Sequence, residues 1–378
     1  MRYFLAGGAV RDLLLGRFPG EFDIVFDGSR EETDRLCANA LRVGKTTATF
    51  IVNGHDHMPL MGGIQEDLLA RDCTMNALLM DEEGRIHALP QTFGDLRDGI
   101  IRAASPTAFS RDPVRVFRAA RFAAVLPGFS VEPETRALMR ETTASPAFSA
   151  IAAERVGNEC MKAMAGHAPG AFLRVLAETG ALAPWLSPLE KGTAIPAGPV
   201  AYHGNDSVMD HITAVMDAIA ALPLTHPLDE QGRALASWMG LCHDLGKLTT
   251  PGEMLPRHIS HESRGVALTE DLANRLRLPK LWEKAGRVAA SLHMKAGNYA
   301  SLRPGTRVDL LHELAASRLF IPFTALVTAD SGDESIADRM RRDMDRVLAV
   351  RLPEMWRDKG QASAVELRRL RVQALKKS

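Results

Sequence analysis

The chain has 378 residues, of which 46% are hydrophobic and 24% charged, a composition typical of a soluble globular protein with about two to four domains. The formal net charge of zero argues against indiscriminate polyanion binding, although local basic stretches leave RNA open as a partner. Four scattered cysteines without a CxxC pair predict a reducing compartment. No apolar run approaches the roughly 18 residues that span a bilayer, and the N-terminal stretch does not resemble a signal peptide. We therefore expect a cytoplasmic protein without a membrane partner.

Residues 1–26 combine two carboxylates with a glycine turn. A short apolar strand leads into Gly7 and Gly8, a helical pattern follows, and a second strand is expected to begin at Glu21. Side chains alternate along a strand, so Glu21 and Asp23 are expected on one face. Hard oxygen ligands suit Mg²⁺, and glycine lets backbone N–H groups approach a phosphate. The stretch predicts a site for a divalent metal that carries a nucleoside triphosphate.

The following residues predict the rest of an α+β head. Ser29 and Glu32 have the spacing of a capping box at the start of a helix. A later helix is expected to carry Asp72 and Asn76 on one face, because they are four residues apart. The expected elements are helices over 29–41 and 66–77, a strand over 47–52, and a hairpin of 78–81 with 85–89.

A basic helix is expected to begin at Asp112, which is a favourable N-cap followed by Pro113 at the first helical position. Asp112, Arg115, Arg118 and Arg121 then recur at three-residue spacing. A carboxylate accepts from an exocyclic amino group, and a guanidinium donates to a ring nitrogen or a carbonyl. The pair could therefore read the Watson–Crick edge of C or A. The alternative is a solvated basic helix face.

A histidine cluster lies further along the chain, in helical sequence. His211 is expected on one helix and the pair His243-Asp244 on the next, while His258 and His261 follow in a loop. Histidine and aspartate at such spacings are typical of the metal ligands of a phosphohydrolase. A lone buried histidine is more often structural, but the run GLCHDLGK with apolar helical flanks favours a metal site.

Together these clusters resemble, in order, the motifs of the bacterial tRNA nucleotidyltransferases, or CCA-adding enzymes, of the poly(A) polymerase family and of the type with a C-terminal HD domain. The motifs that carry the resemblance are GGAVRDLLLG, the Glu-x-Asp strand, ARDCTMNAL, FGDLRDGIIRA, RDPVRVFRAARFAA, AERVGNE and CHDLGK. The resemblance implies an α+β fold with a polymerase-β-like nucleotidyltransferase head, an all-α neck and body, and an all-α HD domain. The expected domains are a head with a nucleotide-selecting helix over 1–125, a helical neck and body over 126–190, an HD-type domain over 200–335 and a basic helical tail over 336–378.

The same resemblance implies roles for particular residues. Glu21 and Asp23 would be the catalytic carboxylates that bind Mg²⁺ and activate the 3′-hydroxyl at the tRNA 3′ end, with CTP and ATP as substrates. Asp112 and Arg115 would form an amino-acid template that selects first C and then A. The residues expected to bind the nucleoside triphosphate are Gly8, Arg11, Arg71, Arg118 and Arg121. A second metal, Ni²⁺ or Mn²⁺, would be held in the HD domain by His211, His243 and Asp244.

The sequence departs from the family pattern at several points, and each departure motivates an alternative. Glu21 stands where the family has Asp, which would shift the metal and favours a catalytically weakened RNA-binding relative. The brief segment 53–63 replaces the family's flexible loop, which favours an enzyme that adds CC only. Met294 stands where a later Asp is expected, so we expect little HD phosphohydrolase activity and do not favour an HD phosphohydrolase with a vestigial head. A poly(A) polymerase of the same fold is a further alternative.

Overall fold

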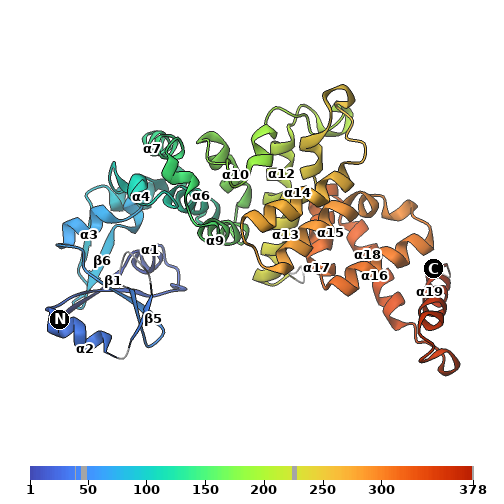
Figure 1. The fold of residues 1–378 in the computed structure, drawn as a ribbon, viewed down its shortest axis with the longest axis horizontal. Helices are drawn as coiled ribbons and strands as arrows, with labels where there is room; N and C mark the ends of the chain where they lie inside the picture. Colours follow the sequence, from blue (N-terminus) through green and yellow to red (C-terminus); the bar gives the residue numbers. More distant parts are fainter. Residues whose placement is uncertain (39, 44–48, 224–227, 377–378) are drawn as a thin grey trace. The chain divides into compact units, whose positions relative to one another are not determined.

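The computed structural model describes residues 1–378 except 39, 44–48, 224–227 and 377–378. Its contacts divide the chain into two compact units (Figure 1). The first comprises Met1–Ile151 together with Glu178–Ala181, and the second comprises Ala152–Ala177 together with Leu182–Ser378. The expected boundaries at 125, 190 and 335 stay predictions.

The first unit contains a seven-stranded sheet in the order β3-β4-β5-β2-β1-β6-β7. The pair β2 and β5 is parallel, and the other neighbouring strands are antiparallel. A further parallel pair, β8 and β9, lies outside this sheet. The strands are β1 (Arg2–Ala6), β2 (Asp23–Asp27), β3 (Leu41–Val43), β4 (Thr49–Val52), β5 (His55–Pro59), β6 (Leu78–Asp81), β7 (Ile86–Ala88), β8 (Ile100–Ile101) and β9 (Ser130–Val131).

The core beside the sheet follows from the alternation of β1. Phe4 and Ala6 are buried, and they cluster with Val25 of β2 and Leu79 of β6. Leu68 closes the cluster from a neighbouring helix, so the sheet buries one apolar face there. The helices of this unit are α1 (Gly8–Leu14), α2 (Arg30–Cys37), α3 (Ile64–Ala70), η1 (Thr74–Asn76), α4 (Thr92–Asp98), α5 (Ala108–Arg111), α6 (Arg115–Val125), α7 (Pro133–Thr143) and α8 (Pro146–Ser149).

Local sequence signals identified several elements of this unit correctly. The capping box of Ser29 and Glu32 is present at the start of α2, with both reciprocal hydrogen bonds. The expected hairpin is formed by β6 and β7, and Gly84 adopts a φ of 80° in its turn. The strand expected over 47–52 is β4, and its first two expected residues lie outside the described part of the chain.

Several expected boundaries are wrong because long-range backbone pairing overrides the local pattern. The helix expected over 29–41 ends at Cys37, and Leu41 begins β3. The helix expected over 66–77 ends at Ala70, since the backbone N–H of Thr74 donates to Arg102 and that of Ala104 to Asp72. The strand expected from Glu21 begins at Asp23, where pairing with β1 and β5 starts.

The basic helix also begins later than expected. Asp112 has extended dihedral angles and follows the short helix α5, and α6 starts at Arg115 with Val114 at its N-cap. No side-chain capping bond is present at this N-cap. A short turn therefore separates Asp112 from the arginines of α6.

The second unit is all-α among its described residues (Figure 1). Its helices are α9 (Ala153–Met164), α10 (Pro169–Glu178), η2 (Ser187–Lys191), α11 (Val200–His203), α12 (Val208–Ala220), α13 (Glu230–Cys242), η3 (Leu245–Thr249), η4 (Gly252–Met254), α14 (His261–Arg275), α15 (Lys280–Gly297), η5 (Tyr299–Ser301), α16 (Pro304–Ser317), α17 (Phe320–Ser331), α18 (Glu334–Ala349), η6 (Glu354–Trp356) and α19 (Gln361–Lys376).

Helix α13 forms the centre of this unit. Its last nine residues are all buried, and the buried indole of Trp238 donates to the carbonyl of Trp282 on α15 at 2.8 Å. The basic helix expected near the C-terminus is α19, and Arg368 on it pairs with Asp309 of α16. None of the helices in the described part of the chain has the length and hydropathy needed to cross a membrane.

Candidate active site and metal centre

Three carboxylates converge at the start of β2. Asp23 is paired in register with Asp56 of the parallel strand β5, and Glu21 lies two residues before the strand. Burial raises the pKa of Asp23, and the charges of Asp56 and Glu21 raise it further. Carboxylates that repel one another in this way become stable together when a cation lies between them. The residues present therefore fit a divalent metal, and Asp56 is a member that sequence reasoning missed.

Arginine side chains face these carboxylates. The charges of Arg71 and Arg118 oppose the rise in the pKa of Asp23, so both guanidinium groups lie within electrostatic range of its carboxylate. Arg71 is held by Asp67, whose Oδ1 accepts from its Nη2 at 2.8 Å. Metal ions and guanidinium groups both bind phosphates, and this site combines carboxylates that could hold a metal with two guanidinium groups in electrostatic range of them.

Gly7 makes this approach of Arg71 possible. It has a φ of 61°, and a Cβ at this position would lie 2.9 Å from Nη1 of Arg71. Gly8 is the first residue of α1, and its Cβ would lie 3.5 Å from Nη2 of Arg11. Gly7 therefore provides both the turn and the room for the Arg71 guanidinium, whereas a Cβ at Gly8 would make only an ordinary van der Waals contact with Arg11.

A buried polar network fixes the arginines. Nη1 of Arg11 donates to Oδ1 of Asn76 at 2.7 Å, and Nδ2 of Asn76 donates to Oδ1 of Asp72 at 3.0 Å. The other carboxylate oxygen of Asp72 accepts from Nε of Arg118 at 2.8 Å. Burial would raise the pKa of Asp72, but Arg118 and Asn76 outweigh it and hold that pKa below its usual range. Asp72 is thus an ionised anchor that links α6 to the segment after α3.

The ring of Phe122 is a second anchor for the same arginines. The guanidinium carbons of Arg11, Arg118 and Arg121 lie 5.6, 5.7 and 4.4 Å from its centroid. Phe122 is 3% exposed, so its position is fixed by the core. An aromatic face attracts cations, and here one ring gathers three of them. The sequence suggested only that Phe122 was apolar, because its contact with Arg11 spans most of the first unit.

Asp112 and Arg115, the expected base-reading pair, lie on either side of the turn before α6. Nη1 of Arg115 donates to the backbone carbonyls of Arg71 at 3.2 Å and Ala108 at 3.0 Å. Burial lowers the pKa of Arg115. The backbone N–H of Arg115 donates to the carbonyl of Asp112 at 3.0 Å. Part of the Arg115 guanidinium is therefore engaged by the protein, and the base-reading role stays a prediction.

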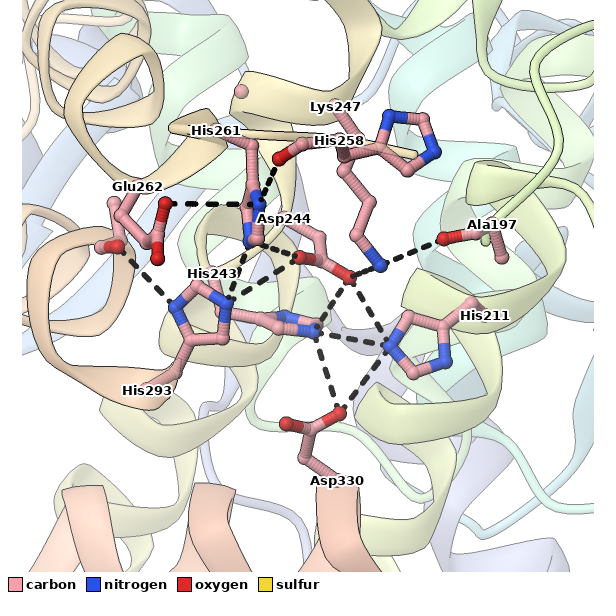
Figure 2. Close-up of polar contacts among 12 residues, drawn as sticks. Ala197, His211, His243, Asp244, Lys247, His258, His261, Glu262, His293 and Asp330 are labelled. Carbon is pink, nitrogen blue, oxygen red and sulfur yellow. Dashed lines mark hydrogen bonds and ion pairs between the residues drawn. The ribbon is translucent and has the colours of Figure 1, made fainter. Parts of the chain in front are cut away.

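The second unit contains a compact cluster of histidines and aspartates (Figure 2). His211, His243 and Asp244 form one group whose ligand atoms could hold a metal, and Asp244, His261 and His293 form another. Asp330 of α17 adds a carboxylate oxygen 3.2 Å from Nε2 of His211. The ligands come from α12, the end of α13, α14, α15 and α17, so five helices meet at this point.

The histidines of the cluster direct their lone pairs inward. Nδ1 of His243 lies 2.7 Å from the carbonyl of Gly240, and Nδ1 of His261 lies 2.7 Å from the carbonyl of His258. Nδ1 of His293 similarly lies 3.0 Å from the carbonyl of Ala289. A carbonyl only accepts, so each Nδ1 carries the proton in the neutral ring and each Nε2 is a free acceptor.

The Nε2 atoms of the four clustered histidines lie close to one another in pairs and close to the carboxylate of Asp244. The Nε2 atoms of His261 and His293 are 3.0 Å apart, and those of His211 and His243 are 3.2 Å apart. Two acceptors at this distance require a proton or a cation between them. Burial would lower the pKa of His243, but the carboxylates of Asp244 and Asp330 raise it to about 10. The cluster therefore has a strong preference for added positive charge.

Asp244 lies between the two groups of ligands. Its Oδ2 lies 3.2 Å from Nε2 of His211 and accepts from Nζ of Lys247 at 2.7 Å. Its Oδ1 lies 3.3 Å from Nε2 of His261, and it is a buried atom without a hydrogen-bond partner among the described residues. An orphaned carboxylate oxygen beside inward-facing imidazoles fits a divalent cation of the kind that histidine prefers.

Comparisons with known proteins match three parts of the chain to family models and most of it to curated relatives. Family models match residues 3–59 (poly A polymerase head domain), 128–191 (probable RNA and SrmB-binding site of polymerase A) and 208–321 (HD domain). The multifunctional CCA protein of Alkalilimnicola ehrlichii is 36% identical over 83% of this chain and 79% of its own length. That of Thioalkalivibrio sulfidiphilus is 34% identical over 100% of this chain and 98% of its own length.

The chain belongs to the multifunctional CCA protein family. Solved CCA-adding enzymes share the fold: that of Thermotoga maritima complexed with tRNA has a TM-score of 0.65 at 17% identity, covering 100% of this chain and 88% of its own. That of Bacillus stearothermophilus in complex with CTP has a TM-score of 0.60 at 24% identity, covering 90% of this chain and 77% of its own. The polymerase-type head, the mostly helical remainder and the HD domain that the resemblance implied are confirmed.

The structure brings many of the predicted site residues close to one another and adds others, while their roles stay predictions. His258 lies outside the metal cluster, because its Nδ1 faces the hydroxyl of Thr250 and its Nε2 the carbonyl of Pro196. Met294 is 43% exposed and takes no part in the cluster, whereas His293 beside it does. Asp330 was missed because it is far in sequence from the histidines of the cluster. Helix packing alone brings it to the site.

Proposed function

We propose that this chain adds C and A nucleotides to the 3′ end of tRNA, using CTP and ATP and a divalent metal at the head. The observation that supports this function best is the meeting of Asp23, Asp56 and Glu21 with the guanidinium groups of Arg71 and Arg118. Family membership supplies the substrate class, since the relatives are CCA proteins. With tRNA as its substrate, the protein would act in the cytoplasm.

In this proposal the carboxylates at the start of β2 and β5 hold Mg²⁺. When bound, the metal supplies Lewis acidity toward the 3′-hydroxyl and neutralises charge on the phosphates. Arg71, Arg118 and Arg11 orient the triphosphate and stabilise the negative charge that passes to pyrophosphate as it leaves. Little reorganisation is needed at that moment, because Asp67 already fixes Arg71, Asn76 fixes Arg11, and Asp72 fixes Arg118.

The first experiment measures the product. The protein is incubated with Mg²⁺, labelled CTP or ATP, and tRNA that ends at the discriminator base. We expect three added nucleotides, CCA. A product that stops after two C residues would support the CC-adding alternative, and a long A tail would support poly(A) synthesis. No incorporation, even with protein in excess of tRNA, would refute the transferase and leave the RNA-binding alternative.

A second experiment tests the metal carboxylates. Asp23→Ala should abolish nucleotide addition, because it removes the half-buried member of the group. Asp27→Asn is a matched control at the other end of β2, where the carboxylate pairs with Arg2 instead. An unchanged rate in Asp23→Ala, or an equal loss in Asp27→Asn, would contradict the assignment.

A second function is favoured by the cluster in Figure 2. We propose that the HD domain is a divalent-metal phosphohydrolase, with Ni²⁺ or Mn²⁺ held by His211, His243, Asp244 and Asp330 and by the neighbouring His261 and His293. When bound, such a metal supplies an activated water. Lys247 holds Oδ2 of Asp244 and also donates to the carbonyl of Ala197, so it orients this carboxylate. Because Asp330 supplies the second carboxylate, Met294 no longer argues against activity.

The test of the second function is release of phosphate. Nucleoside 2′,3′-cyclic phosphates and 2′-monophosphates are incubated with the protein and added Ni²⁺ or Mn²⁺. Hydrolysis that is abolished by Asp244→Asn and retained by Met294→Ala is the expected result. Absence of hydrolysis with each metal would refute this function and leave the cluster as a structural metal site.

A further inference from the structure

A histidine outside the two groups of metal ligands lies beside the cluster of the second unit. His203 is the last residue of α11, and its ring stands edge-on to that of His211, with the ring centroids 5.1 Å apart and the ring planes at 81°. The nitrogens of His203 belong to neither group of ligand atoms that lie within 4.8 Å of one another. His203 is therefore a neighbour of the proposed metal site and not one of its ligands.

His203 lies at the side of the cluster that faces solvent. The side chains of His211 and Asp330 are 15% and 25% exposed. The remaining ligands have side chains that are at most 6% exposed, and they are His243, Asp244, His261 and His293. A substrate therefore reaches the cluster most directly on the side of His211 and Asp330, and the ring of His203 is in contact with His211 there.

The charges of the cluster act on His203. Burial lowers the pKa of His203, and the charges of Lys247 and His211 lower it further. The carboxylates of Asp244 and Asp330 oppose this change in the pKa. The imidazole of His203 is thus within electrostatic range of both the cationic and the anionic members of the site.

The segment that carries His203 is held on both sides of α11. Nζ of Lys247 donates to Oδ2 of the ligand Asp244 at 2.7 Å and also to the carbonyl of Ala197 at 2.7 Å. The backbone N–H of Ala197 in turn donates to the carbonyl of Asp206 at 2.8 Å. Ala197 precedes α11 and Asp206 follows it, so these bonds tie the position of His203 to that of Asp244.

Gly198 leaves the room that the ring of His203 occupies. A Cβ at Gly198 would lie 2.3 Å from Cδ2 and 2.9 Å from Nε2 of His203, which is closer than such atoms approach. The φ of Gly198 is outside the left-handed region, so this glycine provides space and not a special backbone conformation. A side chain at position 198 would displace the imidazole from its place beside His211.

The ring nitrogens of His203 have no hydrogen-bond partner within the described part of the chain. By contrast, the two ring nitrogens of the nearby His258 face the hydroxyl of Thr250 and the carbonyl of Pro196. His203 is also partly exposed, so a ligand can reach it. An imidazole carries at least one N–H donor whether it is neutral or protonated. A fixed donor without a protein partner, at the open side of a metal cluster, favours an anionic oxygen as its acceptor.

We propose that His203 is a further substrate-contacting residue of the HD site, where its ring N–H donates to an oxygen of the substrate phosphate. This inference rests on the proposed phosphohydrolase function and deepens it. The substrates are the same single-phosphate nucleotides, the nucleoside 2′,3′-cyclic phosphates and 2′-monophosphates. Their phosphate would lie at the open side of the cluster, between the metal and His203.

The first measurement separates a substrate contact from a metal ligand. Mn²⁺ is titrated into the full chain, and its binding is followed by isothermal titration. His203→Ala should bind Mn²⁺ as the wild type does, because its ring lies outside both groups of ligand atoms. His211→Ala should bind Mn²⁺ about tenfold or more weakly. An equal loss of Mn²⁺ affinity in the two variants would make His203 a ligand and overturn the proposal.

The second measurement is binding of inorganic phosphate to the Mn²⁺-loaded chain. His203→Ala should weaken phosphate binding by about tenfold or more, the effect of one hydrogen bond to a charged group. His203→Gln retains an N–H donor and should restore part of the affinity. Gly198→Ala keeps the histidine but fills the space of its ring, so it should also weaken phosphate binding.

His167→Ala is the matched control, because His167 is an exposed histidine elsewhere in the second unit. It should leave phosphate binding unchanged. All of these substitutions lie in the second unit, so phosphate binding by the head contributes equally to every variant. The KM for hydrolysis of adenosine 2′-monophosphate should rise in His203→Ala in parallel with the loss of phosphate affinity.

The outcomes distinguish this inference from the function on which it rests. Wild-type phosphate affinity in His203→Ala, or an equal loss in His167→Ala, would overturn the inference and leave the phosphohydrolase standing. Phosphate binding that depends on His203 in a chain that hydrolyses nothing would refute the phosphohydrolase and support the phosphate contact. A wild-type chain that binds neither Mn²⁺ nor phosphate would overturn both.

Discussion

Nε of Arg118 donates to Oδ2 of Asp72 at 2.8 Å, although the two residues are 46 positions apart in the chain. Asp72 is 5% exposed, so replacing it leaves a guanidinium without its buried anchor. We expect Asp72→Asn to lower the free energy of unfolding by about 3 kcal/mol and to raise the KM for CTP. Urea unfolding and steady-state kinetics measure the two effects. Asp98→Asn, at an exposed carboxylate paired with Arg97, should change neither.

The carboxylate of Asp72 makes the stability of the folded protein depend on pH. Its pKa in the folded protein lies below the ordinary 3.8, so its contribution is complete above that value and is lost as the pH falls through the folded pKa. The difference in unfolding free energy between the wild type and Asp72→Asn should therefore be constant above about pH 5 and shrink below about pH 4. A difference that grew on acidification would contradict the ion pair.

Phe122→Leu should impair triphosphate binding more than folding. Leucine keeps most of the apolar volume but removes the ring that attracts Arg11, Arg118 and Arg121. We expect the KM for CTP to rise about three- to tenfold, with a smaller change in kcat. Phe172→Leu, at a buried position in the second unit, is the matched control for loss of an aromatic ring. Equal KM values in the two variants would show that the ring does not position the arginines.

Asp56→Asn tests the carboxylate that only the structure revealed. Because Asp56 stands opposite Asp23 in the sheet, its loss should weaken Mg²⁺ binding and reduce nucleotide addition by about a hundredfold or more. The Mg²⁺ concentration at half-maximal rate should rise as well. Glu21→Asp should retain activity, since it keeps a carboxylate at the exposed end of the group. Full activity of Asp56→Asn would restrict the metal site to Asp23 and Glu21.

Gly7→Ala adds only one methyl group, but it should lower the stability of the protein and weaken its binding of CTP and ATP. The new Cβ would lie 2.9 Å from Nη1 of Arg71, and alanine at a φ of 61° is strained by about 1–2 kcal/mol. We expect a lower melting temperature and a higher KM for CTP and ATP. Gly84→Ala, at a φ of 80° with open space around its Cβ, carries the strain without the contact. It should lower stability and leave KM unchanged.

Metal binding to the HD domain should depend on His293 and not on Met294. His293→Ala and His261→Ala each remove an inward-facing Nε2, and each should weaken Mn²⁺ or Ni²⁺ binding by about tenfold or more. Met294→Ala changes an exposed side chain and should bind metal as the wild type does. Isothermal titration measures both the affinity and the number of ions per chain. A greater loss in Met294→Ala than in His293→Ala would refute the ligand assignment.

Sequence reasoning succeeded where local pattern and motif order agree. The capping box of Ser29, the hairpin of β6 with β7 and the proximity of His211, His243 and Asp244 could be found in this way. Sequence reasoning failed where contacts between distant segments of the chain determine which residues meet. Asp56 adjoins Asp23 only through parallel strand pairing, and Asp330 reaches the histidines only through helix packing. The periodicity of the sequence around Asp56 or Asp330 does not predict these long-range contacts.

The end of the helix expected over 66–77 was predicted wrongly for a related reason. Asp72 and Asn76 were expected on one helix, and their side chains do meet at 3.0 Å. They meet, however, across the extended residue Cys73 and the short helix η1, because the backbone at Asp72 and Thr74 pairs with residues 102–104. The correct contact was therefore predicted from the wrong element. Side-chain chemistry was a better guide here than local backbone propensity.

Asp244 lies among ligands from five helices, and this arrangement constrains how the second unit could evolve. An ion held there would cross-link α12, α13, α14, α15 and α17, and ligand binding to the folded state alone stabilises it by about 2.7 kcal/mol at a hundred times the dissociation constant. The histidines would then be retained for folding even in a descendant that no longer hydrolyses anything. The presence of the same ligands in a relative would therefore indicate that its fold needs the metal, and would not by itself indicate that the relative is catalytically active.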